Sequence, residues 1–298
     1  HTEELLNNIG NPHSYLKFIH IAGTNGKGST CAILNKILIE HGMVVGLYTS
    51  PHLIRFNERI QVNNEKIPDA DIALFMNHYI NQIKNIQTTF FETTTAMAFD
   101  YFNNKSVDIA IIETGLGGRL DSTNVISPTI CGISSVSLDH MDILGDTIQK
   151  IAAEKAGIIK DNIPIVTFDQ NKFVIDIIKK TAAQKNAALT VIKNSDIELL
   201  SIDNQGTLFK YKNYTINLPL RGKHQILNCV LAINIAESII NNIYPDKVNK
   251  AILNTSWLGR IEKLTKSDIY FDVAHNYDGI KAMINTVKSN HPQKKLFG

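Results

Sequence analysis

The feature that most constrains the fold is a glycine-rich turn placed directly between a short apolar run and a helical stretch. Residues 18–22 have the length and the isoleucine content of a buried strand, and helical spacing of apolar positions runs over residues 29–41. Between them lies Gly23-Thr24-Asn25-Gly26-Lys27-Gly28-Ser29-Thr30. Strand, tight turn and helix in this order form the first part of a βαβ unit, so we expect a mainly parallel sheet covered by helices.

The same alternation continues over the first two thirds of the chain. We expect further strands at 44–48, 107–112, 129–134 and 163–168, and further helices at 69–85, 92–103, 147–159 and 172–185. This pattern predicts an α/β fold with a doubly wound sheet around the phosphate loop. The first residues, from His1, have the pattern of a helix already under way.

The pattern changes after about residue 188. Short runs at 198–200, 207–211 and 214–218 are separated by the turn signals Asn204-Gln205-Gly206 and Lys212-Asn213, which predicts a small antiparallel β extension. Helices at 222–240 and 246–253 follow. We place a domain boundary near residue 256, with an ATP-binding domain over 1–255 and the hinge and start of a Rossmann-like second domain over 256–298. An apolar run at 296–298 resembles an unfinished strand, so we expect the second domain to be truncated.

Composition excludes several function classes. Thirty basic and 28 acidic side chains give a formal charge of +2 over 298 residues, too little for a nucleic-acid-binding surface. Three cysteines without paired spacing favour a reducing, cytoplasmic location, and no apolar run has the roughly 20 residues of a membrane helix. We expect a cytoplasmic monomer that acts on small molecules.

The glycine-rich turn has the chemistry of a phosphate loop. Backbone N–H groups of residues 24–30 and the N-terminus of the following helix can surround phosphate oxygens, and Lys27 would add a positive charge. The hydroxyl of Ser29 or Thr30 could bind Mg²⁺. The run departs from the general phosphate-loop pattern because Ile21 stands where a first glycine would be, and Gly28 separates the lysine from the serine. A glycine-rich turn without a ligand is the alternative.

Further motifs follow in a fixed order along the chain. They are Thr49-Ser50-Pro51-His52-Leu53, Phe91-Glu92, the run from Glu113 to Asp121, Asp139-His140, Ala153-Glu154-Lys155-Ala156-Gly157, Leu258-Gly259-Arg260 and Asp272-Val273-Ala274-His275-Asn276. Together with the phosphate loop, this set resembles the folate branch of the Mur ligase superfamily, the folylpolyglutamate and dihydrofolate synthases. The resemblance covers nearly the whole chain and is weakest from about 169 to 218.

The resemblance implies a site for ATP and two magnesium ions. It assigns the metal to Ser29, Ser50, Glu113 and His140, and the nucleotide to Thr24, Asn25, Gly26, Lys27, Gly28, Ser29, Thr30, Asn228, Arg260 and Asp272. Glu113 also follows a buried strand, and ligands of doubly wound sheets bind at that carboxyl edge. A turn serine, a solvated glutamate and a loop histidine are the alternatives for Ser50, Glu113 and His140, and a linker arginine is the alternative for Arg260.

The resemblance also implies catalytic and substrate-binding residues. Lys27, Lys155, His275 and Arg260 form the catalytic set, and Lys155 corresponds to a lysine that can be carbamylated. The helical pattern by itself indicates a solvated surface charge for Lys155. Thr89, Phe91 and Asp121 would bind the pterin, although Phe91 could equally belong to the core.

The implied activity is an ATP-dependent ligation. A folate or dihydropteroate carboxylate would attack the γ-phosphate of ATP, and the amine of L-glutamate would then displace phosphate from the acyl phosphate. Three alternatives remain: another Mur-type amino-acid ligase, a P-loop protein that binds or hydrolyses nucleotide without ligase activity, and an inactive truncated chain. Gly28 and the Ser50-Pro51-His52 stretch favour the folate branch.

Overall fold

An eight-stranded sheet forms the centre of the protein. The computed structural model describes residues 1–168, 170–203, 206–264, 269–291, 293 and 295–296. The strand order is β4-β3-β2-β5-β1-β6-β7-β8. Six neighbouring strands run parallel, in the order β2, β5, β1, β6, β7 and β8. The β3–β4 hairpin adds two antiparallel strands at the edge beside β2. Their bounds are Phe18–Ala22 for β1, Val45–Tyr48 for β2, Ile60–Val62 for β3, Glu65–Lys66 for β4, Ile109–Glu113 for β5, Ile130–Ile133 for β6, Ile165–Phe168 for β7 and Leu189–Ile192 for β8.

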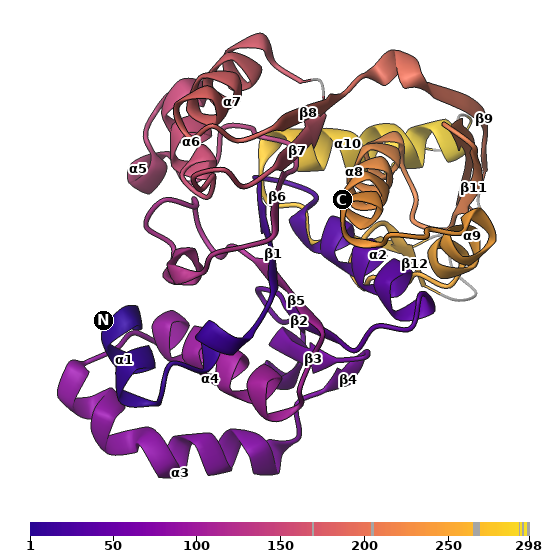
Figure 1. The fold of residues 1–298 in the computed structure, drawn as a ribbon. Coiled ribbons are helices and arrows are strands. Elements are labelled where there is room, and N and C mark those ends of the chain that lie inside the picture. Colours follow the sequence, from indigo (N-terminus) through magenta and orange to yellow (C-terminus); the bar gives the residue numbers. More distant parts are fainter. Residues whose placement is uncertain (169, 204–205, 265–268, 292, 294, 297–298) are drawn as a thin grey trace.

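Helices cover both faces of this sheet, which confirms the predicted doubly wound α/β fold (Figure 1). α2 (Lys27–Glu40) and α8 (Lys223–Ile239) cover one face. On the other face, α1 (Thr2–Asn8), α3 (Asp69–Ile86) and α4 (Phe90–Asn104) lie over one half, and α6 (Ile148–Ala156) and α7 (Lys172–Gln184) lie over the other. Shorter helical segments are η1 (Pro12–Tyr15), η2 (Phe56–Arg59), η3 (Ser122–Val125), α5 (Met141–Leu144) and η4 (Asn194–Asp196).

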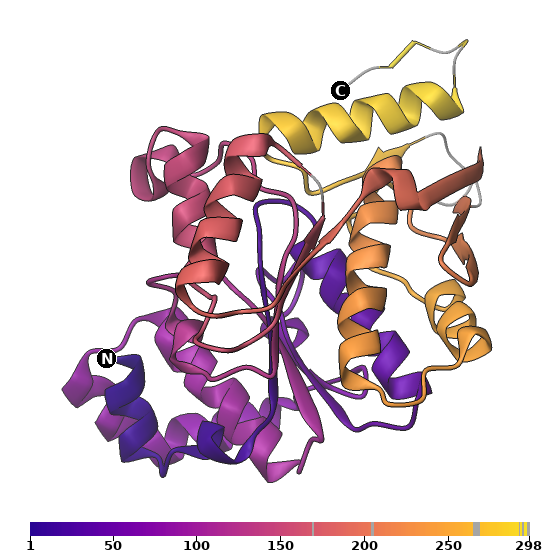
Figure 2. The same ribbon diagram turned by 45° about the horizontal axis from the view of Figure 1, so that its top comes forward.

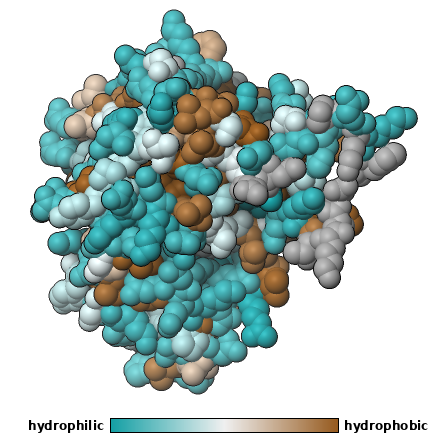
Figure 3. All heavy atoms as spheres, turned by 90° about the vertical axis from the view of Figure 1, so that its right-hand side faces the viewer, coloured by the Kyte–Doolittle hydropathy of each residue, from teal (hydrophilic) through white to brown (hydrophobic). Residues whose placement is uncertain are grey.

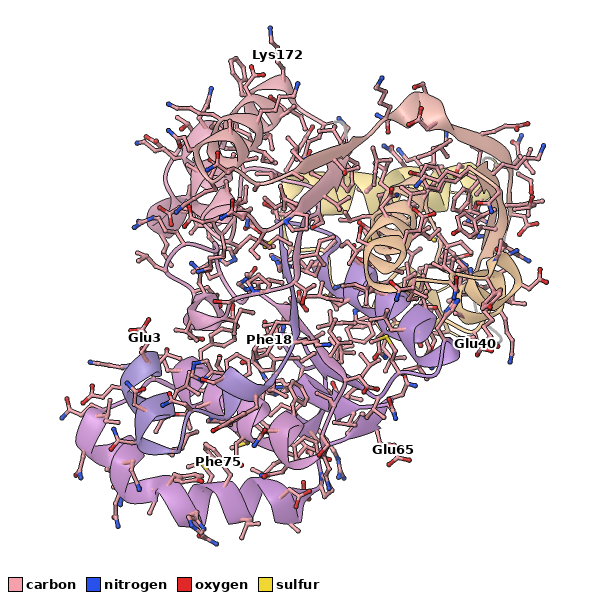
Figure 4. All side chains as sticks on the ribbon, viewed as in Figure 1. Glu3, Phe18, Glu40, Glu65, Phe75 and Lys172 are labelled. Atoms are coloured by element: carbon pink, nitrogen blue, oxygen red, sulfur yellow. The ribbon has the colours of Figure 1, made fainter. Side chains whose placement is uncertain are left out.

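Side chains of the central strands alternate between the two layers because successive residues of a strand point to opposite faces. Ile19 and Ile21 of β1 pack in the core cluster of α2 and α8, whereas Phe18 packs in the cluster of α1, α3 and α4. Figure 4 shows Phe18 and Phe75 inside the molecule, while charged side chains such as Glu40 and Lys172 lie at its periphery. Both faces of the sheet are therefore buried, as a parallel sheet requires.

The sheet reverses its strand order at β1. From β1 the chain passes through α2 to β2 on one side, and β6, β7 and β8 are added later on the other side. Crevices form at the carboxyl ends of the strands at such a switch point. The phosphate loop, which directly follows β1, is placed in this crevice by topology alone.

A separate three-stranded antiparallel sheet confirms the predicted β extension. It consists of β9 (Ile197–Asp203), β10 (Gly206–Tyr211) and β11 (Tyr214–Leu218), and its buried side chains Phe209 and Ile216 join the core of α2 and α8. α9 (Pro245–Leu253) packs beside β11. Figure 3 shows the side of the molecule on which this sheet and α9 lie, where hydrophobic residues form separate patches among hydrophilic ones. The expected turn residues Asn204 and Gln205 lie outside the described residues.

Three strands of the main sheet, β3, β4 and β8, were not expected from the sequence. The β3–β4 hairpin is only five residues of strand around Asn63 and Asn64, both of which have positive φ. β8 extends the parallel sheet with four residues, of which only Ile192 is buried, at the point where the antiparallel meander was expected to begin. The two strands of the hairpin carry too few alternating positions to be read from periodicity.

The C-terminal segment lies across the carboxyl edge of the main sheet. It contains the short antiparallel pair β12 (Glu262–Lys263) and β13 (Tyr270–Phe271), followed by α10 (Tyr277–Asn290), which runs past α8 (Figure 2). Most of the strand expected at 296–298 lies outside the described residues. The division into domains 1–255 and 256–298 stays a prediction. Among the described residues, no helix combines the length and the apolar character needed to cross a membrane.

Candidate nucleotide and substrate site

One cavity of about 880 Å³ lies at the carboxyl edge of the sheet and collects most of the candidate residues. Its walls come from the phosphate loop, the ends of β2 and β5, α8 and the C-terminal segment. The candidates that line it are Thr24, Asn25, Gly26, Lys27, Gly28, Ser29, Ser50, Glu113, His140, Lys155, Asn228, Arg260, Asp272 and His275. Segments up to about 250 residues apart thus meet at one site.

Two glycines of the phosphate loop occupy positions where a side chain has no room. Gly26 has φ of +90°, and a Cβ added there would lie 2.2 Å from Oδ1 of Asn228. A Cβ at Gly28 would lie 2.9 Å from Nε1 of Trp257. The extra glycine in the loop therefore allows the indole of Trp257 to pack on the first turn of α2.

The loop is held in shape from β6. The Ser134 and Ser135 hydroxyls both donate to the Asn25 carbonyl, at 2.9 and 3.0 Å. The Thr24 hydroxyl accepts from the Ser137 backbone N–H at 3.1 Å. These contacts fix the loop backbone before any nucleotide binds, so its N–H groups are pre-positioned for phosphate oxygens.

Two lysines converge on one carbonyl of the loop. Lys27 Nζ donates to the Gly23 carbonyl at 3.1 Å, and Lys155 Nζ donates to the same oxygen at 2.8 Å. Lys155 is only 4% exposed, so the solvated surface position indicated by its helical pattern is wrong. Burial, together with the nearby charge of Lys27, lowers the pKa of Lys155 to about 7. Its amine is therefore partly neutral at physiological pH.

Glu113 is a buried carboxylate at the end of β5. It is 4% exposed, and burial raises its pKa although the positive charge of Lys27 acts in the opposite direction. The Ser50 backbone N–H donates to Glu113 Oε2 at 3.3 Å, which joins the ends of β2 and β5. The alternative of a solvated strand-end glutamate is therefore wrong.

The residues around Glu113 fit a magnesium ion. The Ser29 hydroxyl is buried in the first turn of α2 and has no hydrogen-bond partner in the described part of the chain. An unpartnered buried hydroxyl and a buried carboxylate on one cavity are oxygen ligands of the kind that Mg²⁺ prefers. The Thr30 hydroxyl is also buried without a partner, but Thr30 does not line the cavity.

The C-terminal segment closes the cavity from the opposite side. Asn25 and Asn276 exchange two side-chain hydrogen bonds of 3.0 Å, which tie the phosphate loop to the N-terminus of α10. The carboxylate of Asp272 accepts from the backbone N–H groups of Ile261 and Ala274. Asp272 therefore shapes the hinge as well as lining the cavity, and Arg260 faces the same space.

Comparison with known proteins places the chain in a family. The Mur ligase middle domain matches residues 21–236. The dihydrofolate synthase/folylpolyglutamate synthase of Bacillus subtilis is 37% identical over 99% of this chain and 73% of the relative. The chain belongs to the folylpolyglutamate and dihydrofolate synthase family of Mur ligases.

Other members of this family are similar to this chain in both sequence and fold. The folylpolyglutamate synthase of Lacticaseibacillus casei is 35% identical over 95% of this chain and 71% of its own length. A folylpolyglutamate synthase complex with AMPPCP superposes with a TM-score of 0.89 at 34% identity, covering 97% of this chain and 76% of that one. The Thermotoga maritima folylpolyglutamate synthase gives a TM-score of 0.88 at 35% identity, covering 97% and 70%.

The three candidate pterin residues do not line the cavity themselves, although Phe91 and Asp121 contact Gly115 and Leu116, which do. Thr89 is exposed and caps α4 by accepting from the Glu92 backbone N–H. Phe91 is half-buried, and its ring lies against Gly115, where an added Cβ would be 2.3 Å from Cζ. It also packs at 6.0 Å from the ring of Tyr48, so the ring has a core contact and a loop contact.

Asp121 is held by a buried chain of hydrogen bonds. The Oδ1 atom of Asp121 accepts from the Thr123 hydroxyl at 2.6 Å. The oxygen of that Thr123 hydroxyl lies 2.8 Å from Nε2 of His20. The Oδ2 atom of Asp121 accepts from the Leu116 backbone N–H. With Thr123 donating to the carboxylate, His20 has to donate to Thr123, so the orientation of Asp121 is set from inside β1.

Some residues of the site gave little signal in the sequence. Trp257 is the only tryptophan of the chain, and the sequence did not identify it as a partner of Gly28. Lys36, Gln61 and Asn64 extend the cavity along α2 toward the β3–β4 hairpin. Isolated polar residues in a helix or a hairpin resemble ordinary surface positions until the fold places them together.

Proposed function

We propose that this chain joins L-glutamate to the carboxylate of a folate or of dihydropteroate while ATP is converted to ADP and phosphate. Membership of the family supports an ATP-dependent ligase that forms an amide bond between an acid and an amino acid. A folylpolyglutamate synthase complex with AMPPCP and folate has the same fold as this chain. The observation that carries the proposal is that Lys27, Glu113 and Arg260 line one cavity although they come from three different parts of the fold.

The first step is phosphoryl transfer to the substrate carboxylate. A carboxylate oxygen forms a bond to the γ-phosphorus, and the bond from that phosphorus to the β-γ bridging oxygen breaks with release of ADP. Lys27 and Arg260 supply positive charge on opposite sides of the transferring group, and the loop N–H groups hold the phosphates in place. Such transfers depend mainly on position and charge, which a pre-formed loop can provide.

The second step forms the amide bond. The neutral α-amine of glutamate attacks the acyl carbon, phosphate leaves, and the nitrogen loses one proton. This requires that water be kept from the acyl phosphate, because water would otherwise compete with the amine. The C-terminal segment, joined to the phosphate loop through Asn25 and Asn276, is positioned to cover the reacting groups.

Ser29, Ser50, Glu113 and His140 would hold magnesium. A bound Mg²⁺ would neutralise charge on the phosphate oxygens during the transfer. The unpartnered hydroxyl of Ser29 and the buried carboxylate of Glu113 support this assignment. Burial of the Ser29 hydroxyl and the Glu113 carboxylate without a partner costs free energy. A bound magnesium ion would offset this cost.

Lys155 is a candidate for carbamylation. Its neutral amine would add to CO₂, forming a carbamate and releasing one proton, and so would replace a cation by an anion. The pKa of about 7 supplies the neutral amine, and the nearby positive charge of Lys27 would favour the resulting negative charge. Thr89, Phe91 and Asp121 would bind the pterin, with Phe91 providing an aromatic face and Asp121 accepting hydrogen bonds from ring N–H groups.

The proposal is tested by incubating the protein with Mg-ATP, L-glutamate and either dihydropteroate or tetrahydrofolate. We expect phosphate release matched by a product heavier by one glutamate residue. Lys27→Met should abolish both signals, whereas Lys84→Met, an exposed position on α3, should retain them. Phosphate release that needs neither pterin substrate would contradict the folate assignment, and full activity of Lys27→Met would contradict the role of the loop.

A further inference from the structure

Two imidazoles and one carboxylate meet where the C-terminal segment touches the rest of the protein. His275 Nε2 lies 3.6 Å from Asp139 Oδ2, and His140 Nε2 lies 3.9 Å from Asp139 Oδ1. One ligand atom from each of these three residues lies within 4.8 Å of the others. Asp139 and His140 follow β6, whereas His275 precedes α10, so the cluster spans the contact between two distant segments.

The side chains are oriented by neighbouring groups. His275 Nδ1 lies 3.0 Å from the Val273 carbonyl, so this nitrogen can donate to that oxygen while Nε2 binds an ion. Asp139 Oδ2 accepts from the Asn276 side chain at 3.0 Å, and Oδ1 accepts from the His140 backbone N–H at 2.9 Å. Metal-binding histidines usually donate their other ring nitrogen to a carbonyl or carboxylate in this way.

The spacing matches that of ligands around one ion. Bonds of about 2.0–2.2 Å to a tetrahedral ion place neighbouring ligand atoms about 3.3–3.6 Å apart. The distance of 3.6 Å fits this range, the distance of 3.9 Å is slightly longer, and both exceed those of hydrogen bonds. Both histidine side chains are at least half exposed, so small rotations can close the remaining gap and an ion can enter from solvent.

We propose that Asp139, His140 and His275 bind Zn²⁺ and that the bound ion fastens the C-terminal segment to the phosphate-loop side of the protein. Two imidazole nitrogens favour Zn²⁺ over Mg²⁺, which prefers oxygen ligands. This site overlaps the proposed magnesium set at His140 and adds Asp139 and His275 to it. If His140 binds magnesium as in the proposed function, Zn²⁺ at this site competes for His140 and inhibits the ligase reaction.

The binding test does not depend on the proposed activity. Zn²⁺ is titrated into the protein by calorimetry with Mg²⁺ in excess, and Co²⁺ is added separately to record the visible bands of a low-coordinate nitrogen-oxygen site. We expect one saturable ion per chain. His275→Ala and His140→Ala should each weaken Zn²⁺ binding by about tenfold or more. His78→Ala, which removes an exposed histidine on α3, should bind Zn²⁺ like the unaltered protein.

Limited proteolysis tests whether the bound ion also fastens the C-terminal segment. With Zn²⁺ bound, cleavage near residue 256 should slow at least severalfold in the unaltered protein and not in His275→Ala. Equal Zn²⁺ affinity of His275→Ala and the unaltered protein would overturn the site, as would the lack of saturable binding. Tight binding without any change in cleavage would overturn the fastening of the C-terminal segment.

Discussion

Replacing Lys155 by methionine should stabilise the protein while removing its activity. The folded protein holds the pKa of Lys155 near 7, whereas an unfolded lysine has its ordinary value of 10.5. At about 1.4 kcal/mol for each pH unit, holding this amine at the lowered pKa costs about 4 kcal/mol at pH 7. Methionine keeps the length of the side chain and forms no charge. It loses the hydrogen bond to the Gly23 carbonyl, worth about 1 kcal/mol, and that oxygen keeps its bond from Lys27.

The pH dependence gives the sharper test of this reasoning. Between pH 7 and 10.5 the unfolded lysine binds a proton that the folded lysine has lost, so the free energy of unfolding rises with pH. Relative to Lys155→Met, the unaltered protein should gain about 1.4 kcal/mol for each pH unit in this window. From pH 7.5 to 9.5 the difference between the two proteins should therefore shrink by about 2–3 kcal/mol.

Urea unfolding followed by the fluorescence of Trp257, the single tryptophan, measures this difference. Buffers should be free of CO₂, because carbamylation would replace the proton equilibrium by another reaction. Lys84→Met, exposed on α3, serves as the control and should leave the pH slope unchanged. Parallel pH profiles for Lys155→Met and the unaltered protein would refute a buried lysine with a lowered pKa. Retained ligase activity would separately remove Lys155 from the proposed mechanism.

Three further outcomes are expected. Glu113→Gln should lower kcat/KM by about 10²–10³ without loss of thermal stability, because it removes a buried charge aimed at the nucleotide; unchanged kinetics would contradict the metal role. Gly118→Ala should lower the free energy of unfolding by about 1–3 kcal/mol in urea, because the added Cβ would lie 2.8 Å from the Glu154 carbonyl oxygen. Gly10→Ala is the control: its Cβ would meet no atom within 4 Å, so it should be destabilised only by the strain of its positive φ. Phe91→Leu should raise KM for the pterin substrate severalfold and leave KM for ATP unchanged, and equal changes in both would point to a packing role.

Local sequence patterns were sufficient to predict the five central strands of the main sheet and the phosphate loop. β1 was predicted with its observed bounds, and the order of glycine-rich turn and helix required Lys27 and Ser29 to face a crevice. These features depend on residues close together in the chain, where strand period, helix period and turn preference act directly. The β3–β4 hairpin was not predicted because strands of two and three residues carry almost no period, and β8, in which only one of four residues is buried, was not predicted either.

The amino-acid sequence by itself determined which residue types were present, their order, and the family to which they belong. Only the tertiary structure decided that Lys155 is buried against Gly23, since the helical pattern around it does not say what covers that face of α6. The meeting of Asp139 with His275 and of Asn25 with Asn276 was likewise fixed only by folding. Burial, the direction of a pKa shift and the sharing of one ion all depend on distances between segments remote in the chain, and no local pattern encodes those distances.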